Sequence, residues 1–124
     1  MYKVTNISEL IGLTLLSVKV SEDNDEILFH VDDGRTFRLY HSQDCCESVM
    51  VEDIAGDLED LANSPIVRAE ERISNENPDG VKPEYQDSFT WTFYELATNK
   101  GSVTIRWYGE SNGYYSESVD CTWQ

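Results

Sequence analysis

The chain has 124 residues, 40% of them hydrophobic, which is enough for one folded domain and too few for two ordinary ones. It carries 24 acidic and 9 basic residues, and this formal net charge of −15 disfavours a nucleic acid polymer or an anionic membrane as a partner. No apolar run approaches the roughly 20 residues of a membrane helix, and the first residues lack the pattern of a signal peptide. We therefore expect residues 1–124 to form a single acidic domain in the cytoplasm.

The cysteines agree with a cytoplasmic location. Cys45 and Cys46 are adjacent, and Cys121 stands alone. An odd count with a neighbouring pair is not the pattern of a secreted disulfide framework, because a disulfide between neighbours closes a strained ring. We expect a loop beginning at His41 that passes into an edge strand, with one cysteine of the pair buried and the other exposed.

The N-terminal part predicts a short helix and then a strand. Asn6 to Glu9 matches a capping box, and Gly12 is expected to close the helix. Leu13 to Val20 is apolar and β-branched, as in a strand.

A hairpin is expected next. Two strands, Glu26 to Val31 and Thr36 to Tyr40, flank the sequence Asp33-Gly34, which is a strong hairpin signal. The register that unites the apolar side chains on one face pairs Phe29 with Phe37 and Ile27 with Leu39.

The middle of the chain predicts a second helix and another strand. Ile54, Leu58 and Leu61 have helical spacing, so Asp53 to Asn63 is expected to be a short amphipathic helix. Ile66 to Ile73 can form a strand, and residues 74–87 have the composition of a surface loop.

The last third predicts a hairpin and a final strand over 117–123. Pairing Phe93 with Trp107 places large apolar side chains on one face. These are Phe89, Trp91, Phe93, Val103, Ile105 and Trp107. The opposite face then carries Thr90, Thr92, Tyr94, Thr104, Arg106 and Tyr108. We therefore expect an α+β domain, mainly antiparallel β-sheet built from hairpins, with two short helices.

Arg106 is the centre of the expected binding site. The predicted register sets it opposite Tyr94 and near Tyr108, among threonine hydroxyls that include Thr92. A guanidinium among phenol rings can stack on an aromatic base and hold a phosphate. The loop after Gly109 adds Asn112, Tyr114 and Tyr115. The alternative is a solvated sheet face on which Arg106 pairs with Glu95 or Glu110.

The segment His41 to Ser48 combines a histidine with two cysteines but predicts no metal site. Structural zinc needs four ligands and a spacer between paired cysteines, and neighbouring cysteines do not point readily at one ion. Gly-rich phosphate loops and nucleophile elbows are absent from the sequence. Nothing in the sequence therefore indicates an enzyme or a cofactor.

Two long stretches carry a resemblance to a known family. One joins His41-Ser-Gln-Asp-Cys-Cys-Glu-Ser-Val49 to Glu52-Asp-Ile-Ala-Gly-Asp-Leu-Glu-Asp-Leu61, and the other joins Trp91-Thr-Phe-Tyr94 to the stretch from Lys100 to Val119. They resemble small proteins from phages and prophages, catalogued as a domain of unknown function, which include the Thoeris anti-defence proteins. The resemblance covers most of the chain from about Glu26.

The resemblance implies a non-catalytic sponge in the host cell cytoplasm. Such a protein binds, without cleaving it, a cyclic ADP-ribose isomer that a TIR-domain enzyme makes from NAD. The resemblance also implies a homo-oligomer, a dimer or a hexamer, with pockets between protomers and in some members separate sites for cyclic oligonucleotides. The expected ligand-binding residues combine the predicted sheet face with positions in the two family-like stretches. They are Arg106, Tyr94, Tyr108, Asn112, Tyr114, Tyr115, Thr92, His41 and Gln43. Two alternatives remain: an acidic protein–protein inhibitor that resembles DNA in charge, and a hydrolase or lyase that acts on the signal.

Overall fold

A computed structural model describes residues 3–78 and 86–124 of the chain. Its strands are β1 (Lys3–Val4), β2 (Leu15–Val20), β3 (Glu26–Val31), β4 (Thr36–Tyr40), β5 (Ser48–Ala55), β6 (Arg68–Ser74), β7 (Ser88–Thr98), β8 (Gly101–Ser111) and β9 (Asp120–Trp123). Its helices are the 3₁₀ turns η1 (Ile7–Leu10) and η2 (Leu58–Leu61). The expected α+β fold is therefore corrected to a mainly β one, since no α-helix occurs in the described residues. No helix there is long and apolar enough to cross a membrane.

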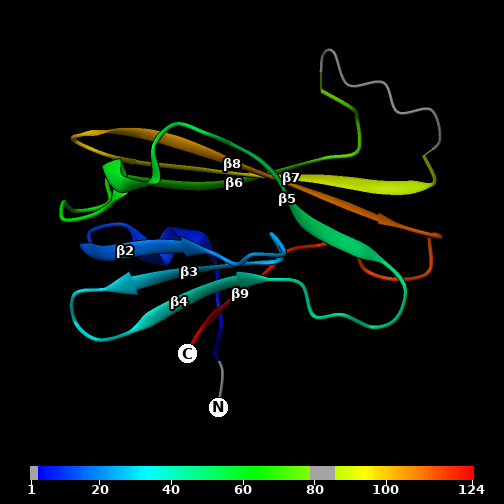
Figure 1. Cartoon of the computed structure of the whole chain (residues 1–124), viewed down its shortest axis with the longest axis horizontal. Helices are drawn as coiled ribbons and strands as arrows, with labels where there is room; N and C mark the ends of the chain where they lie inside the picture. The colour runs from blue at the N-terminus through cyan, green and yellow to red at the C-terminus, as the bar shows by residue number, and fades with distance from the viewer. Residues whose placement is uncertain (1–2, 79–85) are drawn as a thin grey trace.

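Two antiparallel sheets form two layers (Figure 1). One has the strand order β1-β9-β4-β3-β2, and the other has the order β5-β8-β7-β6. β3, β4 and β8 bury alternate residues, and these side chains meet between the sheets in one hydrophobic core. The four-stranded sheet therefore has an inner face toward this core and an outer face directed away from it.

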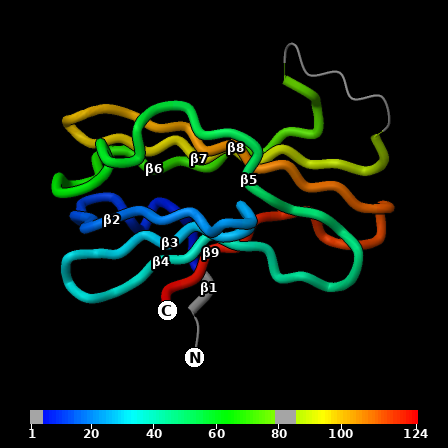
Figure 2. The backbone as a smooth tube through the Cα atoms, in the orientation of Figure 1, coloured from blue at the N-terminus to red at the C-terminus, as the bar shows by residue number. Residues whose placement is uncertain are grey.

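The chain changes sheets twice at the same end of the molecule (Figure 2). Residues 41–47 lead from β4 up to β5, and residues 112–119 lead from β8 down to β9. β9 then pairs with both β4 and β1, so the last strand completes the five-stranded sheet.

The predicted helix start at Asn6 is confirmed, and the strand predicted over Leu13 to Val20 is β2, which begins at Leu15. The Asn6 side chain accepts a hydrogen bond from the Ser8 amide at the start of η1. The hairpin of β3 and β4 has the predicted strand limits and the predicted register, with Phe29 opposite Phe37 and Ile27 opposite Leu39.

The helix predicted over Asp53 to Asn63 is wrong. Asp53 to Ala55 complete β5, and only η2 is helical in this stretch. Gly56 stops the strand with a φ of +109°, a conformation that favours glycine. A Cβ atom there would also lie 2.6 Å from the Ser102 carbonyl oxygen. The apolar spacing reflects two elements that bury Leu61 and half-bury Ile54 and Leu58 beside one core.

The register predicted for the last hairpin is wrong by one residue. β7 and β8 pair Thr98 with Gly101 across a two-residue turn, so Phe93 lies opposite Arg106 and Thr92 opposite Trp107. A slip of one residue moves every side chain of a strand to the other face. Tyr94 and Leu96, not Phe93, therefore share the inner face with Trp107.

Leu96 provides a test of this register, because the slipped pairing would place it on the outer face. It is 0% exposed, so Leu96→Ala should lower the free energy of unfolding by about 2–5 kcal/mol. Glu95→Ala, on the outer face, loses only a surface ion pair with Arg68 and should cost less than about 1 kcal/mol. Urea unfolding followed by far-UV circular dichroism measures both variants. Equal, small losses would contradict the register.

Candidate functional site

The outer face of the four-stranded sheet gathers aromatic and guanidinium side chains. The corrected register places side chains from three neighbouring strands there. This surface, called the aromatic face below, consists of Phe89, Trp91 and Phe93 of β7, Arg106 and Tyr108 of β8, and Arg72 of β6.

Arg106 lies at the centre of the aromatic face. Its Cζ atom is 5.1 Å from the Trp91 ring centroid, and its Nε donates a hydrogen bond of 2.5 Å to Glu52. This hydrogen bond raises the pKa of Arg106 above its usual value. The predicted alternative partners, Glu95 and Glu110, are therefore replaced by Glu52, which lies at the irregularity of β5 between Val51 and Asp53. The terminal nitrogens of Arg106 make no hydrogen bond within residues 3–78 and 86–124, so they can meet another acceptor.

The rings of the aromatic face pack on one another. Trp91 and Tyr108 have centroids 4.5 Å apart, and Phe89 stacks on Tyr108 at 6.4 Å. Trp91 is only 3% exposed although it points away from the main core. The sheet therefore has a second, smaller apolar cluster on its outer side.

Two amides secure the chain above this cluster. Asn77 and Gln86 hydrogen-bond each other through both amide groups, at 2.9 and 3.0 Å. Asn77 accepts a bond from the Trp91 indole nitrogen, and Gln86 donates one to the Tyr108 hydroxyl. These amides flank residues 79–85, so that part of the predicted 74–87 loop lies outside the described residues.

Tyr94 and Thr92 do not share a face with Arg106, which corrects the predicted site. Both are buried on the inner face. The Tyr94 hydroxyl donates to Glu71 at 2.8 Å and lies 3.9 Å from the Cys121 sulfur. Burial raises the pKa of Tyr94. Tyr94 and Thr92 are thus part of the core beneath the sheet.

His41 and Gln43 surround a buried carboxylate that sequence reasoning missed. Glu47 is 4% exposed and accepts hydrogen bonds from His41 Nε2 at 2.8 Å and from the Asp44 and Cys45 amides at 2.9 Å. Gln43 Nε2 donates to the Glu47 carbonyl oxygen at 2.5 Å. Glu47 therefore determines how the 41–47 loop folds.

His41 also joins the two segments that cross between the sheets. Its Nδ1 lies 2.7 Å from the Ser118 carbonyl oxygen, which can only accept a hydrogen bond. His41 and Gln43 line a hollow of about 320 Å³ together with Arg38 and Tyr40. The Arg38 guanidinium lies 3.8 Å from the Tyr40 ring centroid and is paired with Glu26.

Cys45 and Cys46 differ from the prediction. Both are exposed, where one was expected to be buried, and they form a disulfide with each other. The loop does pass into an edge strand, β5, as predicted. Within the described residues no group of three or more His, Cys, Asp or Glu is placed to hold a metal ion.

Asn112, Tyr114 and Tyr115 lie in the turn after β8. Tyr114 is 83% exposed, and its ring packs edge-on against Tyr115 with centroids 5.0 Å apart. Asn112 and Tyr115 line a hollow of about 220 Å³ beside Ser48 and Glu110. The nine predicted residues therefore fall into four places: the aromatic face, the core, the 41–47 loop and this turn.

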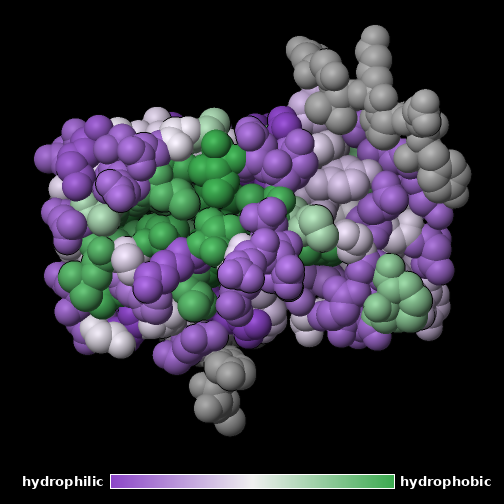
Figure 3. Space-filling view, viewed as in Figure 1, coloured by the Kyte–Doolittle hydropathy of each residue, from purple (hydrophilic) through white to green (hydrophobic). Residues whose placement is uncertain are grey.

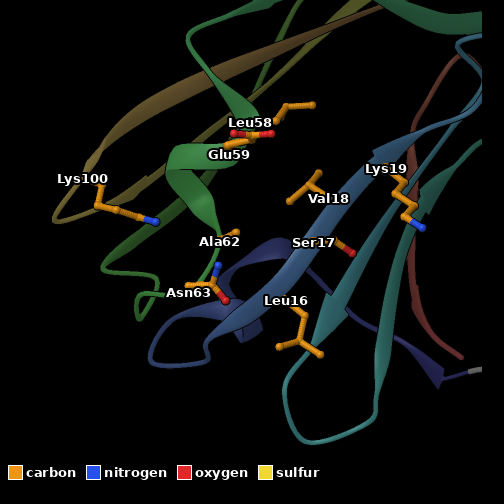
Figure 4. A pocket seen from close by; sticks show the side chains of 9 residues that line it. All are labelled: Leu16, Ser17, Val18, Lys19, Leu58, Glu59, Ala62, Asn63 and Lys100. Carbon is orange, nitrogen blue, oxygen red and sulfur yellow. The ribbon is translucent and has the colours of Figure 1, made fainter.

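A further hollow lies away from all the predicted residues. It has a volume of about 480 Å³ and lies between β2 and η2, where apolar surface is visible between the layers (Figure 3). Val18 and Leu58 contribute to its wall, and Lys100 reaches toward it from the β7–β8 turn (Figure 4). Its lining includes no aromatic ring, so it offers nothing on which a nucleotide base could stack.

Sequence reasoning missed most of the aromatic face. The predicted register places Phe89, Trp91 and Phe93 on the face opposite Arg106, and the predicted site does not include Arg72. Leu96 is the signal that could have corrected the predicted register. It is apolar and lies two residues after Tyr94, so both side chains share one face of β7, and that face is the buried one.

The geometry defines a small two-layer β-protein with an aromatic and cationic surface on one sheet. The chain belongs to the DUF7448 family, a domain of unknown function, whose model matches residues 8–121. No curated protein and no solved structure matches the chain. Membership in a family of unknown function agrees with the expectation from sequence.

The buried Glu47 predicts a dependence of stability on pH. The hydrogen bond from His41 lowers the Glu47 pKa from 4.5 to about 2, against the opposing effect of burial. Charged Glu47 thus stabilises the fold above about pH 4.5, and this contribution is lost as the pH falls toward 2. The difference in unfolding free energy between the wild-type chain and Glu47→Gln should therefore shrink over that range. Urea unfolding at several pH values measures it, and a constant difference would contradict the assignment.

The Cys121 thiol should be unreactive in the folded chain. Burial raises its pKa to about 12, so almost none of the nucleophilic thiolate is present near neutral pH. We expect iodoacetamide at pH 8 to alkylate Cys121 at least about 1,000-fold more slowly than in urea-unfolded protein. Mass spectrometry of the Cys121 peptide follows the reaction. Similar rates in the two states would show that the thiol is accessible.

Proposed function

We propose that the chain binds and retains, without cleaving it, a small anionic nucleotide of the cyclic ADP-ribose class. The observation that carries the proposal is Arg106 over Trp91 with Tyr108 beside it. A guanidinium whose terminal nitrogens make no hydrogen bond to the described residues can hold a phosphate, and neighbouring rings can take part in stacking on a base. The sequence resemblance supplies the ligand class and the non-catalytic role.

The acidic charge of the chain does not oppose such a ligand strongly. Charges separated by more than about 8 Å are largely screened at physiological ionic strength. Affinity for a small anion therefore depends on the groups that touch it. This argument favours a small ligand over a nucleic acid polymer, which would pass near many of the 24 carboxylates.

The proposal includes the assembly and location that the resemblance implies. A homo-oligomer, dimeric or hexameric, would place a second copy against the site and exclude water from it. Exclusion of water strengthens each charged contact with the ligand. The site of action is the host cell cytoplasm, where a TIR-domain enzyme would release its signal.

The first test uses the product mixture of an activated TIR-domain enzyme. The purified protein is incubated with it, separated from unbound material and heated, and the released compounds are identified by mass spectrometry. Release of an intact cyclic ADP-ribose isomer in near-stoichiometric amount is expected. Release of cleaved products would indicate a hydrolase or lyase. No release, with the signal left in solution, would overturn the proposal and favour an acidic inhibitor of a host protein.

Arg106→Ala should weaken retention of the isomer about 10- to 100-fold, the usual effect of removing a charged hydrogen-bond donor. Arg35→Ala is the matched control. Arg35 also lies over a tryptophan, with its Cζ 4.3 Å from the Trp123 centroid, and pairs with a carboxylate, Asp33. It lies in the turn between β3 and β4 of the other sheet, so the control should retain ligand like the wild-type chain. Isothermal titration calorimetry with the purified isomer measures both, and full binding by Arg106→Ala would exclude the aromatic face.

A further inference from the structure

Arg72 and Arg106 flank one aromatic ring. The pairing of β6 with β7 sets Arg72 opposite Phe93, and the pairing of β7 with β8 sets Phe93 opposite Arg106. The three residues thus form one row across three neighbouring strands. The Arg72 Cζ atom lies 4.2 Å from the Phe93 ring centroid. The row therefore presents two guanidinium groups on the aromatic face.

Arg72 differs from the other arginines in having no carboxylate partner among residues 3–78 and 86–124. The other four are each paired: Arg35 with Asp33, Arg38 with Glu26, Arg68 with Glu70 and Glu95, and Arg106 with Glu52. In a chain with 24 acidic residues, an arginine that rests on a ring instead of a carboxylate keeps its fork of N–H donors available.

The positions of Arg72 and Arg106 on either side of β7 favour a ligand with two linked anionic groups. Neighbouring strands lie about 4.8 Å apart, so the backbones of Arg72 and Arg106 are separated by roughly 10 Å. Each long side chain leans over a ring of β7, the strand that lies between them. A single phosphate is satisfied by one fork, whereas a diphosphate offers one phosphate to each.

We infer that Arg72 is a second anion-binding residue and that Arg72 and Arg106 together hold a diphosphate across the Phe93 ring. The inference rests on the proposed function and specifies which group of the ligand the site recognises. Arg72 is a binding residue here, and its stacking on Phe93 sets the direction of its fork.

Calorimetry with a purified cyclic ADP-ribose isomer tests the inference on the full chain. Arg72→Ala should weaken binding about 10-fold or more, and Arg72→Lys should recover only part of it, because an ammonium group lacks the planar fork. The dependence of affinity on salt should also become weaker in Arg72→Ala, since one charged contact with the ligand is lost. A purely structural role of Arg72 would leave that dependence unchanged.

Arg68→Ala is the matched control, because Arg68 lies on the same strand and the same face but is paired with carboxylates. It should bind like the wild-type chain. Wild-type affinity in both Arg72 variants, with the wild-type chain binding the isomer, would overturn the inference and leave the proposed function standing. Failure of the wild-type chain to bind would overturn the proposed function, and the inference with it.

Discussion

The two-residue turn at Asn99 and Lys100 sets the register of β7 and β8, and the positions of all the functional candidates on the larger hairpin depend on it. With this turn, Leu96 and Tyr94 fill the space between the sheets beside Trp107. Phe93 must then face outward together with Arg106. One turn thus decides both how the core is filled and which side chains are offered to a ligand.

The aromatic cluster on the outer sheet face is covered by polar and cationic side chains of the same sheet and of the residues beside it. Arg72 and Arg106 rest over Phe93 and Trp91. The amide pair of Asn77 and Gln86 closes over the same surface and satisfies the Trp91 indole nitrogen. Such a cover buries apolar area without a third layer of secondary structure, and it leaves charged donors at the surface.

The sequence was sufficient for the parts of the fold that local signals determine. Asp33 and Gly34 fixed the first long hairpin to the residue, because turn chemistry and apolar alternation agreed there. In β7 they did not agree, since Phe93 and Leu96 are both apolar but lie on opposite faces. The shared face of Arg106 and Tyr108 could be predicted, because β8 alternates cleanly. The buried position of Glu47 could not be predicted. Among the 24 acidic residues of the chain, only its folded surroundings distinguish it from the others.

The three tryptophans give the chain a set of internal reporters. Trp107 is fully buried in the core, Trp91 lies under Arg106 on the aromatic face, and Trp123 packs edge-on against Phe37 in the other sheet. Replacing two of them by phenylalanine leaves a single emitter whose spectrum reports on one region. The chain emitting from Trp91 alone would sense changes at the aromatic face, whereas the Trp107 emitter would sense only loss of the core.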